Sequence, residues 1–423
     1  MISTLKNAWK IPDIRKKMTF TFVMLLIFRL GSSIPVPYMD KTVIKSIFEA
    51  SQGGLLQFLD LMAGGTFSDF SIFATNIYPY ITASIIIQLL TIAIPRLEEL
   101  LKEGEDGQKK MNRYTRIIAI VLAFIQAIGY TIGIFSDALV VNSTLQKLIV
   151  IITLVAGTAL LIWIGDLITE KGIGNGISLI IFVGIISRLP ASLINIIKLI
   201  SIGELEIFKV LVFGIVFLAI IAIVVALQEG ERRISVQYAK RVVGRKMYGG
   251  QSTHIPIKVS MSGVMPVIFA SSLLSLPQTI SLFFKGSQNW VTKYLTPQGS
   301  VGIWIYSILN VLLIMGFTYF YTAVQFNTVE YAKSLQQNGG FIPGIRPGRP
   351  TSEALNKVVS RITFVGALSL AILASLPIIL SKLFKMDVNF GGTAIIIVVG
   401  VALETVKQIE SQMLMRHYKG FLK

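Results

Sequence analysis

Residues 207–227 read IFKVLVFGIVFLAIIAIVVAL, an uninterrupted apolar run in which Lys209 is the one charged side chain. A helix that crosses a bilayer needs about 20 apolar residues, so this run predicts a transmembrane helix. Apolar stretches of similar length recur along the rest of the chain, at 18–37, 71–94, 114–136, 146–168, 177–199, 263–284, 302–325, 358–381 and 392–412. The sequence therefore predicts an all-α membrane protein with ten transmembrane helices.

The composition agrees with this class. The chain has 423 residues, 53% of them hydrophobic and 14% charged, and its mean hydropathy is +0.71, which is too apolar for a soluble protein of this length. It contains no cysteine, which excludes disulfides, thiol nucleophiles and cysteine zinc sites. The two histidines, His254 and His417, lie outside the predicted spans. We expect no catalytic residues, no metal site and no cofactor.

The basic residues predict the orientation in the membrane. Most of the 39 Lys and Arg residues fall in the tails and in the loops 95–116, 228–258 and 326–361, and such positive loops stay in the cytosol. Both termini are then cytosolic, which requires an even number of spans. The basic N-terminus resembles the start of a signal peptide, but its apolar run is long, contains Arg29 and lacks a cleavage site. We therefore expect a retained first helix.

One apolar segment is too short to span. Residues 54–69 read GLLQFLDLMAGGTFSD, flanked by the glycine pairs Gly53-Gly54 and Gly64-Gly65. Its apolar residues predict a helix of about three turns, either a re-entrant element or an external amphipathic helix. They are Leu55, Leu56, Phe58, Leu59, Leu61 and Met62.

Two basic loops have local structure of their own. In 228–258, Ile234, Val236 and Tyr238 alternate with polar residues, which indicates a strand, and the later glycines favour a protruding hairpin. In 326–361, two Pro-Gly turns hold Arg346 and Arg349 on a rigid tip. These surfaces suit anionic partners such as lipid head groups, RNA or an acidic protein, or they only keep the loops in the cytosol.

Isoleucines four residues apart share a helix face, as Ile77 with Ile81 and Ile177 with Ile181 do. Met265 and Ile268 share a face in the same way. Such residues from several helices can form an apolar constriction that blocks ions. Taken alone, however, isoleucine on a membrane helix more often faces lipid or core.

Enzyme classes find little support. Gly172-Ile173-Gly174-Asn175-Gly176 has the wrong spacing for a dinucleotide loop and is better explained as a break between two spans. An ion-coupled transporter remains an alternative, because such proteins bury ionisable residues near the bilayer centre. The candidates here are Arg29, Asp166 and Glu404.

Six stretches in order along the chain carry a family resemblance. They are PYITASIIIQLL (79–90), KEGEDGQKKMNRYTR (102–116), ITEKGIGNGISLIIF (168–182), QSTHIPIKVSMSGVMPVIFASS (251–272), FIPGIRPGRPT (341–351) and NFGGTAIIIVV (389–399). With these motifs the chain resembles the SecY family, which forms the large subunit of the bacterial protein-conducting channel. The resemblance covers essentially the whole length.

The resemblance implies a clamshell of two pseudo-symmetric halves, residues 1–200 and 201–423, with segment 54–69 as a plug. It implies partner docking at Arg245, Arg346 and Arg349, and a lateral gate with Thr82, Gln88 and Leu276. The pore ring that it implies is formed by Ile77, Ile81, Ile177, Ile181, Ile268 and Ile397.

By the same resemblance, the function would be to move unfolded secretory polypeptides across the bacterial cytoplasmic membrane and to release membrane segments laterally. The implied partners are the small subunits SecE and SecG, the motor ATPase SecA, the ribosome, signal sequences and anionic lipids, with a homodimer as an option. A secondary transporter of small solutes is the alternative.

Overall fold

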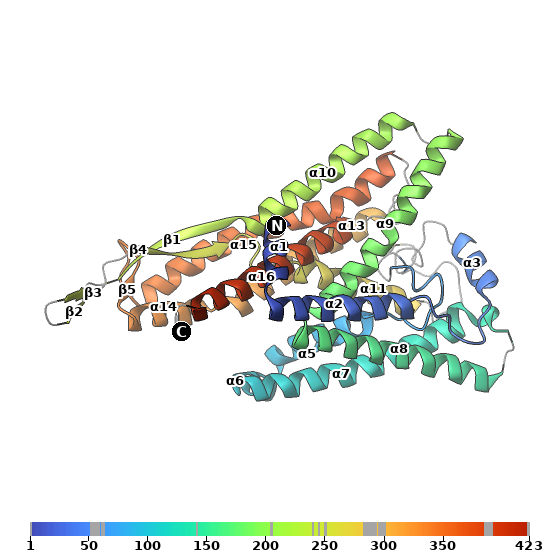
Figure 1. Ribbon diagram of the computed structural model, residues 1–423, viewed down its shortest axis with the longest axis horizontal. Helices are drawn as coiled ribbons and strands as arrows, with labels where there is room; N and C mark the ends of the chain where they lie inside the picture. The colour runs from blue at the N-terminus through green and yellow to red at the C-terminus, as the bar shows by residue number, and fades with distance from the viewer. Residues whose placement is uncertain are drawn as a thin grey trace.

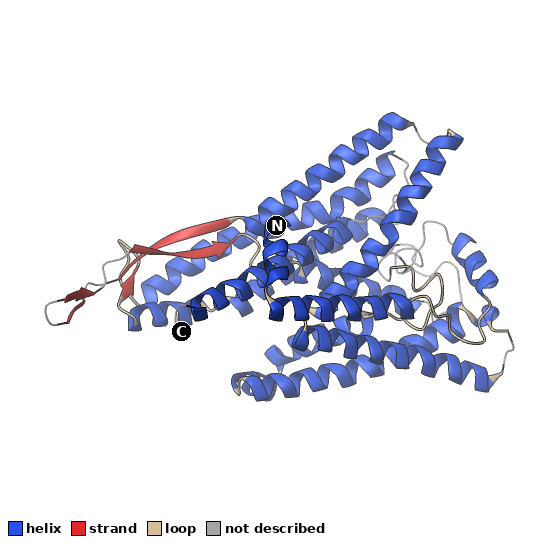
Figure 2. Cartoon of the chain, in the orientation of Figure 1, coloured by secondary structure: helices blue, strands red, loops and turns tan. Residues whose placement is uncertain are grey.

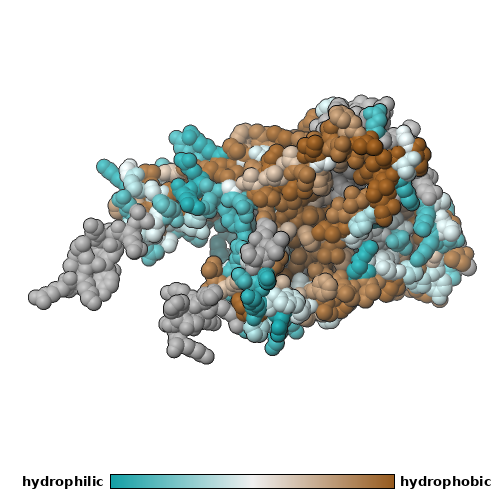
Figure 3. All heavy atoms as spheres, turned by 45° about the horizontal axis from the view of Figure 1, so that its top comes forward, coloured by the Kyte–Doolittle hydropathy of each residue, from teal (hydrophilic) through white to brown (hydrophobic). Residues whose placement is uncertain are grey.

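The computed structural model describes residues 2–50, 60, 64–140, 143–203, 206–238, 241–243, 246–248, 252–281, 294, 302–384 and 392–420. Long helices run side by side through the molecule, and a small sheet extends from one end (Figures 1 and 2). Figure 3 shows a broad hydrophobic band across the middle of one face, with hydrophilic residues gathered at both ends. This distribution fits a protein whose middle lies in a bilayer.

Each of the ten predicted apolar segments overlaps one long helix. These helices are α2 (Pro12–Gly31), α5 (Tyr78–Ala93), α7 (Glu105–Ile128), α8 (Thr144–Lys171), α9 (Gly176–Ile202), α10 (Ile207–Glu229), α11 (Met265–Ser281), α13 (Gly302–Gln325), α15 (Arg349–Phe384) and α16 (Gly392–Gly420). Shorter elements join them: α1 (Ile2–Lys10), α3 (Lys41–Ala50), α6 (Pro95–Lys102), the π-helix η1 (Gly129–Ile134), the 3₁₀-helix η2 (Ser136–Ala138) and α14 (Thr328–Gln337).

Within the described ranges, six helices are long and apolar enough to cross a membrane by themselves, and a seventh span results if α5 and α6 count together. Helices α5 and α6 meet at a bend of 102°. The bend follows from Pro95, which forces Ile94 out of the helical region to φ −117° and ψ 107°. Of the remaining long helices, α2 carries charged residues near both ends, α16 carries them from Glu404 onward, and α11 is short.

Two predicted boundaries are wrong, for local reasons. The second span was expected over 71–94, but α5 begins only at Tyr78, and the residues before it form turns. Asn76 takes the left-handed conformation at φ 51° just before the helix, and its Oδ1 accepts a hydrogen bond from Ile77 N at 2.8 Å. The first span was expected over 18–37, but α2 ends at Gly31, shortly before Pro35 and Pro37.

The predicted break between the fourth and fifth spans is confirmed. Gly174 adopts φ 89°, and Gly176 N donates to Thr169 Oγ1 at 3.0 Å. Ile173 N donates to Thr21 Oγ1 at 3.0 Å, which fastens the turn to α2. The glycines thus serve a tight connection between α8 and α9.

The helices enclose two main apolar clusters. The larger one lies among α2, α5, α8, α9, α10, α11, α13, α15 and α16. The smaller one is largely aromatic and joins the turns before α5 to η1: the rings of Phe67 and Tyr130 lie 4.9 Å apart, and those of Phe70 and Phe135 lie 4.8 Å apart. Phe67, Phe70 and Phe135 are at most 1% exposed. Residues 66–77 are therefore part of the packed core.

The predicted hairpin in 228–258 is confirmed. Strand β1 (Glu231–Tyr238) pairs antiparallel with β4 (Ser252–Lys258), from Glu231 opposite Lys258 to Gln237 opposite Ser252. Strand β5 (Gly340–Phe341) pairs with the end of β1, and β2 (Arg241–Val243) pairs with β3 (Lys246–Tyr248) further out. Val236, Leu335, Ile342 and Leu355 fill a small core between this sheet, α14 and α15.

Candidate functional site

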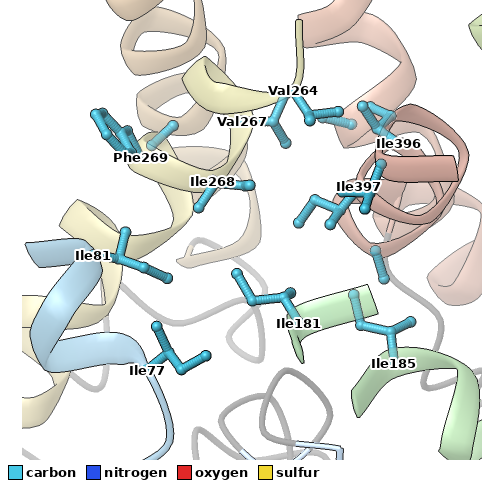
Figure 4. Packing of buried hydrophobic residues seen from close by; sticks show 14 of the residues in the cluster. Ile77, Ile81, Ile181, Ile185, Val264, Val267, Ile268, Phe269, Ile396 and Ile397 are labelled. Atoms are coloured by element: carbon cyan, nitrogen blue, oxygen red, sulfur yellow. The ribbon is translucent and has the colours of Figure 1, made fainter. Parts of the chain in front are cut away.

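Five of the six predicted ring isoleucines line one small cavity at the centre of the molecule. The cavity measures about 20 Å³, and Ile77, Ile81, Ile181, Ile268 and Ile397 form most of its wall. We call these five residues the isoleucine ring. Figure 4 shows their side chains converging from α5, α9, α11 and α16. Each is at most 7% exposed, and a space this small accommodates about one water molecule.

The ring residues lie close to the N-terminal ends of their helices. Ile77 is the residue before α5, and Ile81 N donates to its carbonyl oxygen at 3.0 Å. Ile268 is in the first turn of α11, which begins at Met265, and Ile181 and Ile397 are in the second turns of α9 and α16. Four helix starts thus surround the cavity.

The sixth predicted residue, Ile177, does not line the cavity. It is partly buried, and a Cβ placed on Gly165 of α8 would lie 3.2 Å from its Cγ1, so Ile177 packs between α9 and α8. Ile185, which the sequence analysis did not single out, lies beside Ile181 in Figure 4 and is 1% exposed. The spacing of 177, 181 and 185 by four residues was a signal that could have included it.

Polar groups also border the ring. The cavity wall includes Asn76, Tyr78 and Ser271. In the part of the chain that the structure describes, the Tyr78 hydroxyl and the Ser271 Oγ are buried without a hydrogen-bond partner. The wall is therefore mostly apolar, with a few polar atoms on the side of α5 and α11.

Two of the predicted gate residues form hydrogen bonds between helices. Thr82 Oγ1 on α5 lies 3.1 Å from Ser272 Oγ on α11. Gln88 Oε1, also on α5, accepts a hydrogen bond from the Tyr321 hydroxyl on α13. The third residue, Leu276, is half-buried on α11. The seam where α5 meets α11 and α13 is thus held partly by isolated polar contacts.

The predicted plug helix falls on Leu55, Leu56, Phe58, Leu59, Leu61 and Met62, which lie outside the described residues. Asp60 is described and is 7% exposed. The expected hinge at Gly64-Gly65 has turn geometry, with φ 66° and 91°. Phe67, within the predicted segment 54–69, is packed in the aromatic cluster together with Phe70.

Of the three predicted docking residues, two are described. Arg346 is exposed on the turn between β5 and α15, and its guanidinium has no ion-pair partner among the described residues. Arg349 was expected on the loop tip but is the first residue of α15, where its Nε lies 3.1 Å from Glu353 Oε1. Gly344 and Gly348 adopt φ 82° and 99°, which forms the two predicted turns. Arg245 lies outside the described residues.

The two acidic candidates, Asp166 and Glu404, both lie near basic residues. Asp166 Oδ2 on α8 lies 2.7 Å from Arg116 Nη2 on α7, so this carboxylate has a structural partner. Glu404 lines a second, polar cavity of about 260 Å³ together with Lys258 and Lys407. Val264 and Met265, at the start of α11, also line this cavity, which places it on the β4 side of the isoleucine ring.

Comparison with known proteins identifies close relatives. The SecY family model matches residues 71–406. A protein translocase subunit SecY from Halalkalibacterium halodurans is 45% identical over 100% of both chains. The protein of the same name from Thermotoga maritima is 41% identical, over 100% of this chain and 98% of its own length.

Solved structures share the fold. A protein-conducting channel structure superposes with a TM-score of 0.70 at 19% identity and covers 95% of this chain and 93% of its own. A SecY structure, whose plug domain stabilises the closed state and maintains a membrane seal, superposes with a TM-score of 0.68 at 20% identity and covers 95% of this chain and 92% of its own. The channel of a canine ribosome–channel complex from the endoplasmic reticulum gives a TM-score of 0.65 at 18% identity, over 95% and 93% of the two chains.

Proposed function

The chain belongs to the SecY family. We propose that its own residues form the pore, the seals and the lateral gate of a protein-conducting channel. It moves unfolded secretory polypeptides across a membrane, and it is a channel rather than an enzyme. The observation that supports a pore at its centre is the isoleucine ring, in which four helices bring five buried isoleucines to one cavity of about 20 Å³.

The ring seals the resting channel because isoleucine cannot replace the hydration shell of an ion. An ion in a narrow, apolar constriction loses most of its hydrogen bonds to water, which costs many kcal/mol. A polypeptide is different, since its apolar side chains fit against isoleucine and its passage spreads the ring. Because isoleucine side chains offer no hydrogen bonds, the ring can accommodate many sequences without selecting one.

Segment 54–69 acts as the plug, a second seal beside the ring. Its glycine pair, Gly64 and Gly65, lies against α9, the helix that supplies Ile181 to the ring. The left-handed φ angles of both glycines give the chain a turn at the point where a plug would need to pivot.

The seam between α5 and the pair α11 and α13 is the lateral gate. Two inter-helix hydrogen bonds cross it, from Thr82 to Ser272 and from Tyr321 to Gln88. A few such bonds close a seam without fusing it, because each contributes only about 1 kcal/mol. A signal sequence or a membrane segment is an apolar helix and can leave through this opening into lipid.

The chain divides into two halves, residues 1–200 and 201–423, that open like a clamshell. Contacts between them include α5 with α11 on one side and α2 and α9 with α16 on the other. Opening at the first contact would separate the lateral gate, while the second could act as the hinge side. The polar cavity lined by Lys258, Glu404 and Lys407 then forms the inner vestibule.

The sheet, α14 and the Arg346 turn form a docking surface for the proteins that drive transport. We assign SecA and the ribosome to this surface, with Arg245, Arg346 and Arg349 as contacts, and SecE and SecG to the membrane-embedded sides. Anionic lipids, and a second copy of the channel, are further partners. The basic loops support a cytosolic location for this end and both termini in a bacterial cell, with the helices in its cytoplasmic membrane.

The alternative of a small-solute transporter has no support. Its acidic candidate Asp166 is paired with Arg116, and the relatives are translocase subunits.

Cross-linking tests the proposal directly. The chain has no native cysteine, so a single cysteine at Ile181 or Ile268 can be paired with one in a stalled secretory polypeptide without background. We expect cross-links that depend on the motor or the ribosome. The matched control is a cysteine at Ile164, which is 1% exposed in α8 but does not line the cavity. Cross-links equally strong at Ile164, or none at either ring position, would overturn the proposal.

A further inference from the structure

A charged residue of the plug is held against α9 by a set of polar contacts. The Arg188 guanidinium forms an ion pair with Asp60, and it also donates to Ser68 Oγ at 2.7 Å. Ser68 N donates to the other carboxylate oxygen of Asp60 at 2.7 Å. The side chain of Asp60 is 11% exposed and that of Arg188 is 32% exposed, so most of this cluster is shielded from water.

The backbone next to this cluster lies directly on α9. A Cβ placed on Gly64 would be 2.5 Å from Gly184 Cα, and one placed on Gly65 would be 2.4 Å from Arg188 Nε. Ser187 Oγ lies 3.4 Å from the Gly64 carbonyl oxygen. No residue larger than glycine fits here without a shift, so the contact depends on the glycine pair.

The chain on the far side of the glycine pair is anchored separately. Phe67 and Phe70 pack against Tyr130 and Phe135, away from α9. If the segment before Gly65 leaves its resting place, the contacts of Asp60 must break while those of Phe67 can persist. When the segment leaves, the carboxylate of Asp60 therefore has to separate from the guanidinium of Arg188.

The same helix carries the ring residue and the arginine. Ile181, Gly184 and Arg188 are separated by three and four residues, so they follow one another along one face of α9. A polypeptide that spreads the ring pushes on Ile181 and moves this face. It also brings water into the site, which weakens an ion pair that is strong in its shielded state.

We propose that the Asp60–Arg188 ion pair is a latch that determines how strongly a signal sequence must act before the channel opens. Asp60 and Arg188 are thus specificity-determining residues for translocation, and Ser68 positions the arginine. This inference rests on the proposed roles of the ring and the plug. It adds a defined electrostatic contact that weak signals fail to break.

The test uses the full channel complex in proteoliposomes with Arg188→Gln and Asp60→Asn. Two substrates are compared, one with an intact signal sequence and one with a charge in the apolar core of its signal. We expect translocation of the defective substrate to rise about tenfold or more, because removing one partner of a buried pair strongly favours the open state. Translocation of the intact substrate should change little. The double variant should show a rise no larger than that of the single variants, because it loses the same contact but leaves no unpaired charge behind.

A second ion pair in the chain provides the matched control. Arg116 and Asp166 join α7 to α8 at 2.7 Å without touching the plug, so Arg116→Gln should leave signal selectivity unchanged. Arg188→Lys retains the charge but not the planar fork, and we expect a smaller rise than with glutamine. This milder change also provides a readout if Arg188→Gln fails to assemble.

The outcomes separate the latch from the proposed function. Ile181→Ser is measured in the same vesicles for ion leak. If that variant leaks while the Asp60 and Arg188 variants keep wild-type selectivity, the latch is wrong and the ring stands. The latch would also be wrong if Arg116→Gln raised translocation of the defective substrate as much as Arg188→Gln does. If Ile181→Ser does not leak, the ring itself is wrong.

Discussion

At the scale of single residues, the channel depends on what isoleucine lacks. Its branched side chain fills space at the ring but offers neither a donor nor an acceptor, and each ring residue is at most 7% exposed. A pore that is closed by such residues can open without breaking a specific hydrogen bond. The same property explains why the site was difficult to distinguish from ordinary core by sequence.

Ile181 and Ile177 provide a comparison within one helix. Ile181 lines the cavity and Ile177 packs against α8, although both lie on the same face of α9. We predict that Ile181→Ser raises the resting ion conductance of proteoliposomes about tenfold or more, since about 1.4 kcal/mol removed from a barrier is worth that factor. Ile177→Ser should raise it much less. Equal conductance in the two variants would contradict the ring as defined here.

At the scale of elements, the helices follow from apolar length, but the connections do not. All ten apolar segments overlap long helices, because a span must satisfy its own backbone hydrogen bonds. Residues 66–77 were expected to divide between the plug and the second span. They form packed turns because Phe67 and Phe70 find Tyr130 and Phe135, which lie about sixty residues later in the sequence. Local periodicity contains no information about such partners.

At the candidate site, too, the sequence predicted local features but not contacts between distant residues. Shared helix faces pointed to Ile77, Ile81, Ile177, Ile181 and Ile268, and the family resemblance assigned their role and added Ile397. Neither showed that Ile177 packs away from the cavity. Neither identified the contact of Asp60 with Arg188, because 128 positions separate the two residues. The Pro-Gly turns around Arg346 were predictable, since proline and glycine define turn geometry locally.

The turn between β5 and α15 can be tested as a docking element. Arg346 has no ion-pair partner among the described residues, whereas Arg349 is paired with Glu353. We predict that Arg346→Glu reduces motor-driven transport at least tenfold, because it reverses a charge that is available to an anionic partner. Arg349→Glu should reduce it less. Membrane assembly should stay normal in both, as measured by membrane extraction. Full transport with Arg346→Glu would contradict the docking role.

At the scale of the whole molecule, the basic loops and the arrangement of the elements predict one orientation in the membrane. The sheet, α6 and α14 lie at one end of the helix bundle, and α3 lies at the other (Figure 1). The basic loops belong to the first of these ends, which predicts that this end is cytosolic.

Single cysteines can test this orientation, because no native cysteine interferes. Glu99 in α6 and Lys41 at the start of α3 are both exposed. We predict that a membrane-impermeant maleimide added to intact cells labels Lys41→Cys, while Glu99→Cys is labelled only after the membrane is opened. Labelling of both from the same side would contradict the predicted orientation.

Two of the helix starts around the ring, those of α5 and α11, have an electrostatic consequence. The N-terminal end of a helix carries a partial positive charge of about half an elementary unit, and its effect extends over roughly the first turn. Ile77, Ile81 and Ile268 lie within a turn of the starts of α5 and α11, so two positive dipole ends lie beside the constriction although its lining is apolar. Any ions that pass a widened ring should therefore be mostly anions. The backbone would then protect the cation gradients of the cell even while the side chains are held apart.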